Sequence, residues 1–396
     1  MSGGDSDPCR PAARRSAALV GAAHYRKPSY GHNHPLAIPR VSLTLDLIAA
    51  YEALDETEWV RSRTASVGEL TGFHTVDYVR AVQRAEAFGM VRADDRVRHQ
   101  LGTVENPYFP GLFYTPALAT GGSIQAADRV LTGQNAFSPA GGMHHAVPDQ
   151  ARGFCYFNDV VLAILRLRSA GRRVLYLDID AHHGDGVEAA FWDDASVMTV
   201  SLHMDTNYAY PFHGGTLEEE GGPNALGLTL NVPLPKGTHD AEYRQVFECL
   251  WDPLVERFRP DAVVLQTGTD ALFGDPLGRF ALSTAGFLGV VERVVASGIP
   301  VLATGGGGYH PLLLARAWTG VWALLSGRDL PVGLPKAASE ALGAVGWDED
   351  EDEPYYENLF RDRLEYGEEQ PVRPVIRDII HALTHHRALR RRLWAS

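Results

Sequence analysis

The chain has 396 residues, 45% of them hydrophobic, and a formal net charge of −13. This composition supports a sizeable core, and the acidic charge argues against direct nucleic-acid binding and favours basic, lysine-rich partners. No apolar run is long enough to predict a membrane span, and an odd count of three cysteines favours a reducing, cytoplasmic compartment. We expect residues 1–17 to form a disordered tail without a signal-peptide core, followed by a single domain over residues 18–396.

Apolar strands and amphipathic helices alternate along the chain, a pattern typical of an α/β fold. Strands are expected to begin at Asn135, Val174, Asp261 and Val301. Helices are predicted over residues 123–131, 158–169, 241–258 and 283–297. The acidic run 348–353 is expected to be a solvated loop, and residues 375–394 are expected to form a C-terminal helix with basic residues at its end.

The first of these strands leads into a glycine-flanked loop that carries His144 and His145. Two adjacent histidines cannot both face inward on a strand, but on an irregular loop they can converge on one point. Histidine titrates near neutrality, so one of them could take a proton from water and later deliver it to an amine. Taken alone, a histidine pair is more typical of a protein surface.

The second strand is an apolar run that leads into Asp178, Asp180 and His182. Such a run predicts a strand buried on both faces, where ionisable side chains are tolerated only when paired or bound to metal. If the segment stays extended, these three side chains emerge on one face and could contribute half of a metal site. Asp178 and Asp185 are further carboxylates that could orient a histidine ring.

Asp270 follows the third strand, at the edge where open α/β sheets bind their ligands. With Asp180 and His182 it would offer two oxygens and one nitrogen, which leaves a position open as in catalytic zinc sites. Iron(II) suits the same donors. By itself, Asp270 would be equally typical of a turn or a helix N-cap.

The fourth strand runs into four glycines followed by Tyr309. Glycines allow the backbone to approach a ligand closely, and a tyrosine beyond them could donate its hydroxyl to a substrate carbonyl. The alternative is a flexible hinge with an ordinary surface aromatic residue.

The order of these motifs, together with the segment Gly-Phe-Cys-Tyr-Phe-Asn over residues 153–158, resembles the zinc-dependent histone deacetylase superfamily. The resemblance runs from about His34 to the helix after Tyr309 and is closest to the class I-like branch, which includes bacterial acetoin-utilization deacetylases. It implies an arginase/deacetylase-type α/β fold, with a central, mostly parallel sheet flanked by helices on both faces and an active site at the carboxyl ends of the strands. It also implies zinc-dependent removal of acetyl groups from acetyl-lysine of protein substrates, with release of acetate.

The resemblance also implies roles for individual residues. It implies that zinc is bound by Asp180, His182 and Asp270. The implied catalytic residues are His144, His145, Tyr309, Asp178 and Asp185, with His145 favoured as the general base and acid. The implied substrate-binding residues are Glu105, Gly153, Phe154, Tyr210, Leu277 and Arg40. An implied potassium site consists of Asp178, Asp180, His182, Ser201 and Leu202.

Two residues depart from the family pattern at the substrate tunnel. Glu105 stands where relatives usually have an aspartate that holds the substrate backbone, and Tyr210 replaces the usual phenylalanine of the tunnel wall. The turn over residues 211–215 also differs. These departures leave the peptide-binding preference open.

Three alternative functions follow from the same residues. Hydrolysis of acetylpolyamines or other small N-acyl amines uses the same chemistry and stays open. An arginase-like enzyme with two manganese ions is disfavoured, because Leu272 stands where a second bridging aspartate is needed. A non-catalytic acyl-lysine-binding module would be expected to lose a ligand or the tyrosine, and all are present. The sequence does not indicate the oligomeric state.

Overall fold

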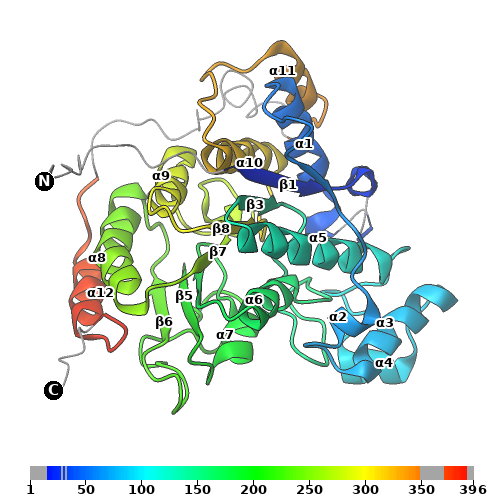
Figure 1. Cartoon of the computed structure of the whole chain (residues 1–396), viewed down its shortest axis with the longest axis horizontal. Helices are drawn as coiled ribbons and strands as arrows, with labels where there is room; N and C mark the ends of the chain where they lie inside the picture. The colour runs from blue at the N-terminus through cyan, green and yellow to red at the C-terminus, as the bar shows by residue number, and fades with distance from the viewer. Residues whose placement is uncertain (1–15, 28–29, 32–33, 348–369, 390–396) are drawn as a thin grey trace, which may run out of the picture.

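The computed structural model describes residues 16–27, 30–31, 34–347 and 370–389 (Figure 1). In these residues eight strands form one sheet, in the order β2-β1-β3-β8-β7-β4-β5-β6. Every pairing between neighbouring strands is parallel, which confirms the predicted sheet. The strands are β1 (Ala17–Gly21), β2 (Trp59–Arg61), β3 (Asn135–Ser138), β4 (Val174–Asp178), β5 (Val197–Met204), β6 (Thr229–Leu234), β7 (Ala262–Gln266) and β8 (Val301–Thr304).

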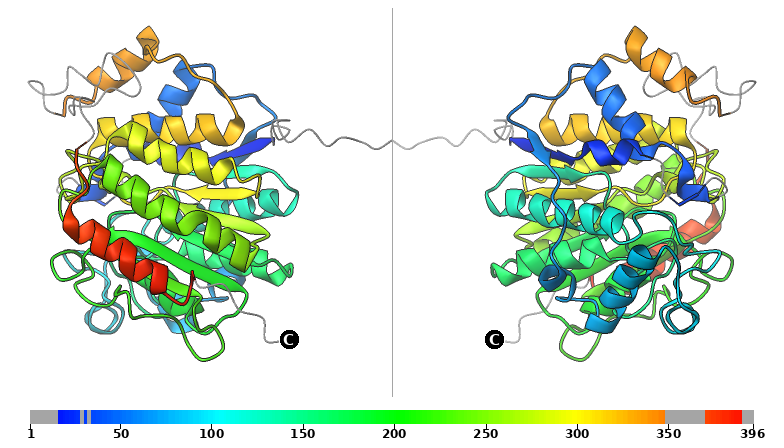
Figure 2. Two further views of the ribbon diagram at one scale, coloured as in Figure 1. Left: turned by 90° about the vertical axis from the view of Figure 1, so that its left-hand side faces the viewer. Right: turned by 90° about the vertical axis from the view of Figure 1, so that its right-hand side faces the viewer.

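Helices cover both faces of the sheet (Figure 2). One face packs against α1 (Arg40–Ala50), α8 (Asp240–Phe258), α9 (Thr284–Val295) and α10 (Pro311–Ser326), with α11 (Lys336–Gly343) and α12 (Pro374–His385) further out. The other face packs against α5 (Tyr114–Leu131), α6 (Asp159–Ser169) and α7 (Asp185–Phe191). A third cluster joins α5 and α6 to α2 (Val67–Leu70), α3 (Val76–Phe88) and α4 (Ala93–His99). The described residues also form the short 3-10 helices η1 (Ala23–Arg26), η2 (Pro35–Ala37) and η3 (Thr269–Ala271).

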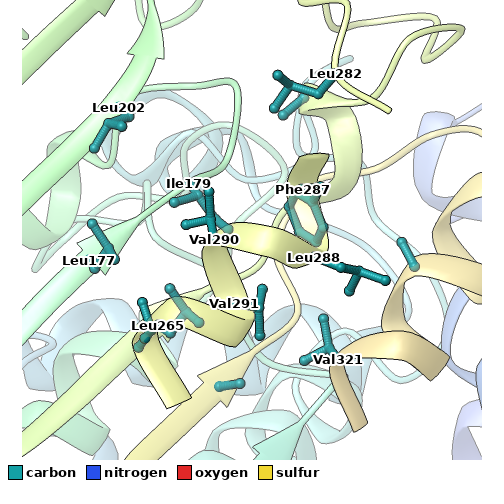
Figure 3. Close-up of a cluster of buried hydrophobic side chains, with 14 of the residues drawn as sticks. Leu177, Ile179, Leu202, Leu265, Leu282, Phe287, Leu288, Val290, Val291 and Val321 are labelled. Atoms are coloured by element: carbon teal, nitrogen blue, oxygen red, sulfur yellow. The ribbon is translucent and has the colours of Figure 1, made fainter. Parts of the chain in front are cut away.

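Helix α9 shows how the sequence determines this packing. The Ser283 side chain accepts a hydrogen bond from the Gly286 N–H at 2.9 Å and caps the helix. Apolar residues at positions 287, 290, 291 and 294 then recur at helical spacing and are buried. Figure 3 shows side chains of α9 in one buried cluster with Leu177, Leu202 and Leu265 of the neighbouring strands. Each such side chain contributes about 1.5–3 kcal/mol by leaving water.

The predicted starts of the ordered chain and of the first predicted helix are wrong. Ala17, assigned to the tail, begins β1 and is buried, while residues 1–15 lie outside the described residues. Helix α5 begins at Tyr114, ahead of the predicted start at residue 123. Gly121 and Gly122 weaken the helix signal in the sequence of the first half of α5, because glycine is a weak helix former. A Cβ atom at Gly121 would lie 1.9 Å from the Arg63 carbonyl oxygen, so close packing requires a glycine there.

The strand before the candidate metal ligands also ends earlier than expected. Strand β4 ends at Asp178, and residues 179–184 bend across the edge of the sheet instead of continuing as an extended strand. Helix α12 ends at His385, where His386 takes an extended conformation, so the helix is shorter than predicted. The acidic run 348–353 lies outside the described residues. No helix in the described part of the chain combines the length and the apolarity that a membrane crossing needs.

Candidate active site

The candidate residues meet because four neighbouring strands end at one edge of the sheet. Strands β3, β8, β7 and β4 are adjacent and parallel, so the loops after them lie side by side. These loops carry the histidine pair, Tyr309, Asp270, and the segment from Asp180 to His182, respectively. Residues as far apart in the sequence as Leu36 and Tyr309 therefore line one small cavity.

Asp180, His182 and Asp270 form a buried cluster, and their potential ligand atoms all lie within 4.8 Å of one another. His182 Nδ1 lies 2.9 Å from Asp270 Oδ2. The Gly307 N–H donates to Asp180 Oδ2 at 2.6 Å, and the Ala181 N–H donates to Asp270 Oδ1 at 2.9 Å. Among the described residues, no other cluster of this kind is present.

The electrostatics of this cluster fit a bound cation. Burial, together with the neighbouring Asp180 carboxylate, raises the pKa of Asp270. Burial alone would lower the pKa of His182, but the Asp270 carboxylate raises it to about 10. Two buried carboxylates this close destabilise each other unless positive charge lies between them. A divalent cation would supply that charge, and the donor set of two oxygens and one nitrogen suits zinc or iron(II).

The two loop histidines each contact a different carboxylate. His144 Nδ1 lies 2.8 Å from Asp178 Oδ2, and His145 Nδ1 lies 2.8 Å from Asp185 Oδ1. Both histidines are buried, and their ring centroids are 4.0 Å apart. A carboxylate at Nδ1 fixes the ring and leaves Nε2 for the reaction. Asp178 and Asp185, which the sequence analysis offered as carboxylates that could orient a histidine ring, thus each contact one ring of the pair.

The same geometry separates the pKa values of the two histidines. Burial lowers the pKa of His144, but the Asp178 carboxylate more than offsets this and raises the pKa to about 9. Burial and the charge on His144 lower the pKa of His145 to about 4. At neutral pH one ring is therefore an imidazolium and the other a neutral imidazole. A pair of groups separated in this way can supply an acid and a base.

Tyr309 is held by a carboxylate that the sequence analysis did not identify. The Tyr309 N–H donates to Asp275 Oδ2 at 2.7 Å. The other oxygen of Asp275 accepts hydrogen bonds from the N–H groups of Leu277 at 2.9 Å and Gly278 at 3.1 Å. Burial raises the pKa of Tyr309 well above its usual value, so its hydroxyl stays protonated and can donate. A carboxylate that binds backbone groups across 34 residues leaves no signal in a sequence pattern.

The walls of the cavity are aromatic. Phe154 has a φ of 68°, in the left-handed region, and its carbonyl oxygen accepts a hydrogen bond from the Tyr30 hydroxyl at 2.8 Å. Its ring centroid is 6.0 Å from that of Tyr309. On another side, the ring of Tyr210 lies edge-on to His145 with a centroid distance of 4.7 Å. Both expected wall residues therefore lie beside the candidate catalytic groups.

Glu105 and Tyr210, the two residues that depart from the family pattern, contact each other. The Glu105 carboxylate accepts a hydrogen bond from the Gly153 N–H. The Tyr210 hydroxyl also forms a hydrogen bond with the Glu105 side chain. Burial and this negative charge raise the pKa of Tyr210, so its hydroxyl is the donor. Glu105 thus joins the Gly153 turn to the Tyr210 wall, a contact that the sequence analysis did not anticipate.

The remaining candidate residues lie at the two ends of the cavity and beside β4. Arg40, at the start of α1, donates to the Gly306 carbonyl oxygen and lies 5.1 Å from the ring centroid of Trp318. Leu277 is 37% exposed, consistent with a position on the outer rim. Ser201 is the register partner of Asp178 in the sheet, and Leu202 follows it on β5.

A model of the histone deacetylase domain matches residues 34–325, and the chain therefore belongs to the histone deacetylase family. Its fold agrees with this assignment. It resembles the crystal structure of an HDAC homolog from Aquifex aeolicus with a TM-score of 0.86 and 42% identity, over 93% of this chain and 99% of that chain. A solved HDAC homolog in complex with SAHA gives the same values.

Eukaryotic relatives are also similar. Histone deacetylase 1 of Homo sapiens is 39% identical over 309 residues, which cover 77% of this chain and 64% of that protein. The matched region thus spans slightly less than two thirds of that relative. Histone deacetylase RPD3 of Saccharomyces cerevisiae is 38% identical over 330 residues, which cover 82% of this chain and 75% of that protein.

Proposed function

We propose that this protein is a metal-dependent deacetylase that hydrolyses the acetyl amide of acetyl-lysine in proteins or peptides. The observation that carries the proposal is the buried cluster of Asp180, His182 and Asp270 beside a cavity lined by His145 and Tyr309. Membership of the histone deacetylase family supports the same reaction.

Asp180, His182 and Asp270 would hold the metal ion. Histone deacetylases are generally zinc-dependent, and iron(II) would suit the same ligands in the cell. When bound, the ion supplies Lewis-acid chemistry that polarises the amide carbonyl and makes water more acidic. A potassium ion beside Asp178, Asp180, His182, Ser201 and Leu202 is a further part of the proposal, supported by the pairing of Asp178 with Ser201.

The protons of the reaction would be handled by three residues of the chain. His145, neutral at pH 7, accepts the proton of the attacking water through Nε2 while Asp185 holds its Nδ1. The protonated Tyr309 hydroxyl donates to the carbonyl oxygen as that oxygen becomes negative. A histidinium of the pair then gives a proton to the lysine nitrogen as the C–N bond breaks, and His144 keeps its charge beside Asp178.

The shape of the site suits an uncharged acyl-lysine. The walls from Phe154 and Tyr210 exclude water, which favours the neutral amide over the charged lysine product. The Gly153 carbonyl oxygen would accept the substrate N–H, and Leu277 would contact the residue at the mouth. Beyond Arg40 lies a second cavity of about 220 Å³, large enough for acetate. The Arg40 guanidinium would attract that anion.

A cytoplasmic location is part of the same proposal. Of the cysteines in the described residues, both Cys155 and Cys249 are free thiols, which suits a reducing compartment. The net charge of −13 suits basic, lysine-rich substrates.

The substrate class is tested by comparing two substrates with the purified, zinc-loaded protein. Acetate release from an acetyl-lysine peptide and from an N-acetylpolyamine would be measured as kcat/KM. We expect the peptide to be the better substrate. Turnover of the polyamine alone would move the function to small-molecule amides, and turnover of neither by a zinc-loaded protein would contradict the proposal.

A further inference from the structure

The loop that carries the histidine pair has no regular structure of its own. It follows β3, spans residues 139–147 and is largely buried. Buried backbone N–H and C=O groups outside helices and sheets need other partners, because leaving them unpaired costs free energy. Two side chains at the start of α6, Asn158 and Asp159, supply many of these partners. Neither was given a role by the sequence analysis.

Asp159 binds the first half of the loop. Its carboxylate accepts hydrogen bonds from the Gly142 N–H at 3.0 Å and the Met143 N–H at 2.8 Å. The Ser123 hydroxyl of α5 donates to the same carboxylate at 2.5 Å. Asp159 is completely buried, so bulk water does not compete for these contacts. The two residues directly before His144 are therefore fixed to α6.

Asn158 binds the second half. Its side-chain NH2 group donates to the His144 carbonyl oxygen at 3.1 Å and to the Ala146 carbonyl oxygen at 3.0 Å. These are the carbonyl groups on either side of His145. The side-chain oxygen of Asn158 accepts a hydrogen bond from the Val161 N–H at 3.0 Å and caps α6. An asparagine supplies both donors and the acceptor, which no other side chain of this length does.

We propose that Asn158 and Asp159 are positioning residues that hold the loop of His144 and His145 in its reactive geometry. This inference rests on the proposed deacetylase function and goes beyond it, because neither residue touches the substrate. The two histidine–carboxylate contacts of 2.8 Å require each ring to stay within about 0.5 Å of its position. Helix α6, anchored in the core beside α5, provides the rigid support for that position.

The test uses Asn158→Ser in the full, zinc-loaded protein. Serine keeps an oxygen for the helix cap but is too short to donate to both loop carbonyls. We expect kcat for the acetyl-lysine peptide to fall about 10- to 100-fold, with KM changed by less than about threefold. We also expect the pH–rate profile to shift and the imidazole ¹H–¹⁵N NMR signals of His144 and His145 to move.

Ser66→Ala is the matched control. Ser66 caps α2 on an exposed surface, so its loss lowers the melting temperature without touching the site. Asn158→Ser leaves two buried carbonyl groups unpaired, so its melting temperature should fall further than that of the control. Its kcat is therefore measured per folded, zinc-bound protein, well below the melting temperature of either variant, and should be lower than that of the control. A wild-type kcat with unmoved imidazole signals would overturn the inference, and so would a loss of kcat that matches the loss of folded protein.

If Asn158→Ser does not fold, a variant of Asp159 tests the same inference. Asp159→Ala removes the acceptor of the Gly142 and Met143 N–H groups, and the same NMR signals should move. If the wild-type protein deacetylates no substrate, the proposed function fails separately. The imidazole signals then decide this inference without any activity.

Discussion

The replacement Asp185→Asn tests the proton-transfer role of His145 most selectively. Asp185 Oδ1 lies 2.8 Å from His145 Nδ1, and the two side chains are only 9% and 7% exposed. Asparagine has nearly the same shape, so the substitution removes the charge and leaves the packing in place. Because so little of either side chain is exposed to water, solvent screens the Asp185–His145 interaction only weakly.

The magnitude follows from the type of contact. A buried hydrogen bond to a charged group contributes about 1.5–3 kcal/mol. Each 1.36 kcal/mol corresponds to a factor of ten in rate, so we expect kcat to fall about 10- to 150-fold. The carboxylate also raises the pKa of His145. Its removal should therefore make His145 a weaker base and shift the acidic limb of the pH–rate profile to lower pH. KM should change little, because Asp185 does not contact the substrate.

Steady-state deacetylation across pH, with Asp252→Asn as control, measures this effect. Asp252 is an exposed carboxylate of α8 that pairs with Arg293, so its replacement removes the same charge far from the site. The reasoning would be refuted by an Asp185→Asn protein that is folded, binds zinc and keeps the wild-type kcat.

Three further predictions concern metal, pH and packing. Removal of zinc by a chelator should abolish activity and lower the melting temperature. If zinc had been present at 1,000 times its Kd, the loss of stability should be about 4 kcal/mol. Activity and melting temperature should both return when zinc is added back. Burial lowers the pKa of His74 from 6.5 to about 4. As pH falls from 6.5 to 4, His74 is protonated in the unfolded chain before it is protonated in the folded protein, which should lower the free energy of unfolding by about 3 kcal/mol. In urea unfolding, the free energy should depend less on pH in His74→Gln than in the wild type. An unchanged pH dependence in that variant would contradict the assignment. Gly121→Ala should lower stability by about 1–3 kcal/mol in the same assay, because its Cβ would collide with the Arg63 carbonyl oxygen; a wild-type value would contradict the packing argument.

The parts of the site that follow strands could be predicted from the sequence. Apolar runs identify buried parallel strands, and the ends of such strands meet at one edge. Asp180, His182, Asp270 and the Gly-rich loop were therefore expected to converge, and the structure brings them together. The prediction worked even though β4 ends at Asp178, because the bend after it still directs both ligands toward Asp270.

The supporting contacts could not be predicted in the same way. Asp275 binds the backbone of Tyr309, Asp159 binds the backbone of Gly142, and Glu105 joins Gly153 to Tyr210. Each contact links segments whose separation is set by the whole fold. A backbone N–H group is present at every residue except proline, so it carries no sequence signal that would identify its partner.

The most direct test of the central claim is acetate release from an acetyl-lysine peptide by the zinc-loaded wild-type protein and by Tyr309→Phe. We expect turnover by the wild-type protein and a loss of about 100- to 1,000-fold in kcat when the hydroxyl is removed. Equal turnover by both proteins would show that Tyr309 does not stabilise the reacting carbonyl. No release by a folded wild-type protein that binds zinc would contradict the assignment of this site as an acetyl-lysine deacetylase.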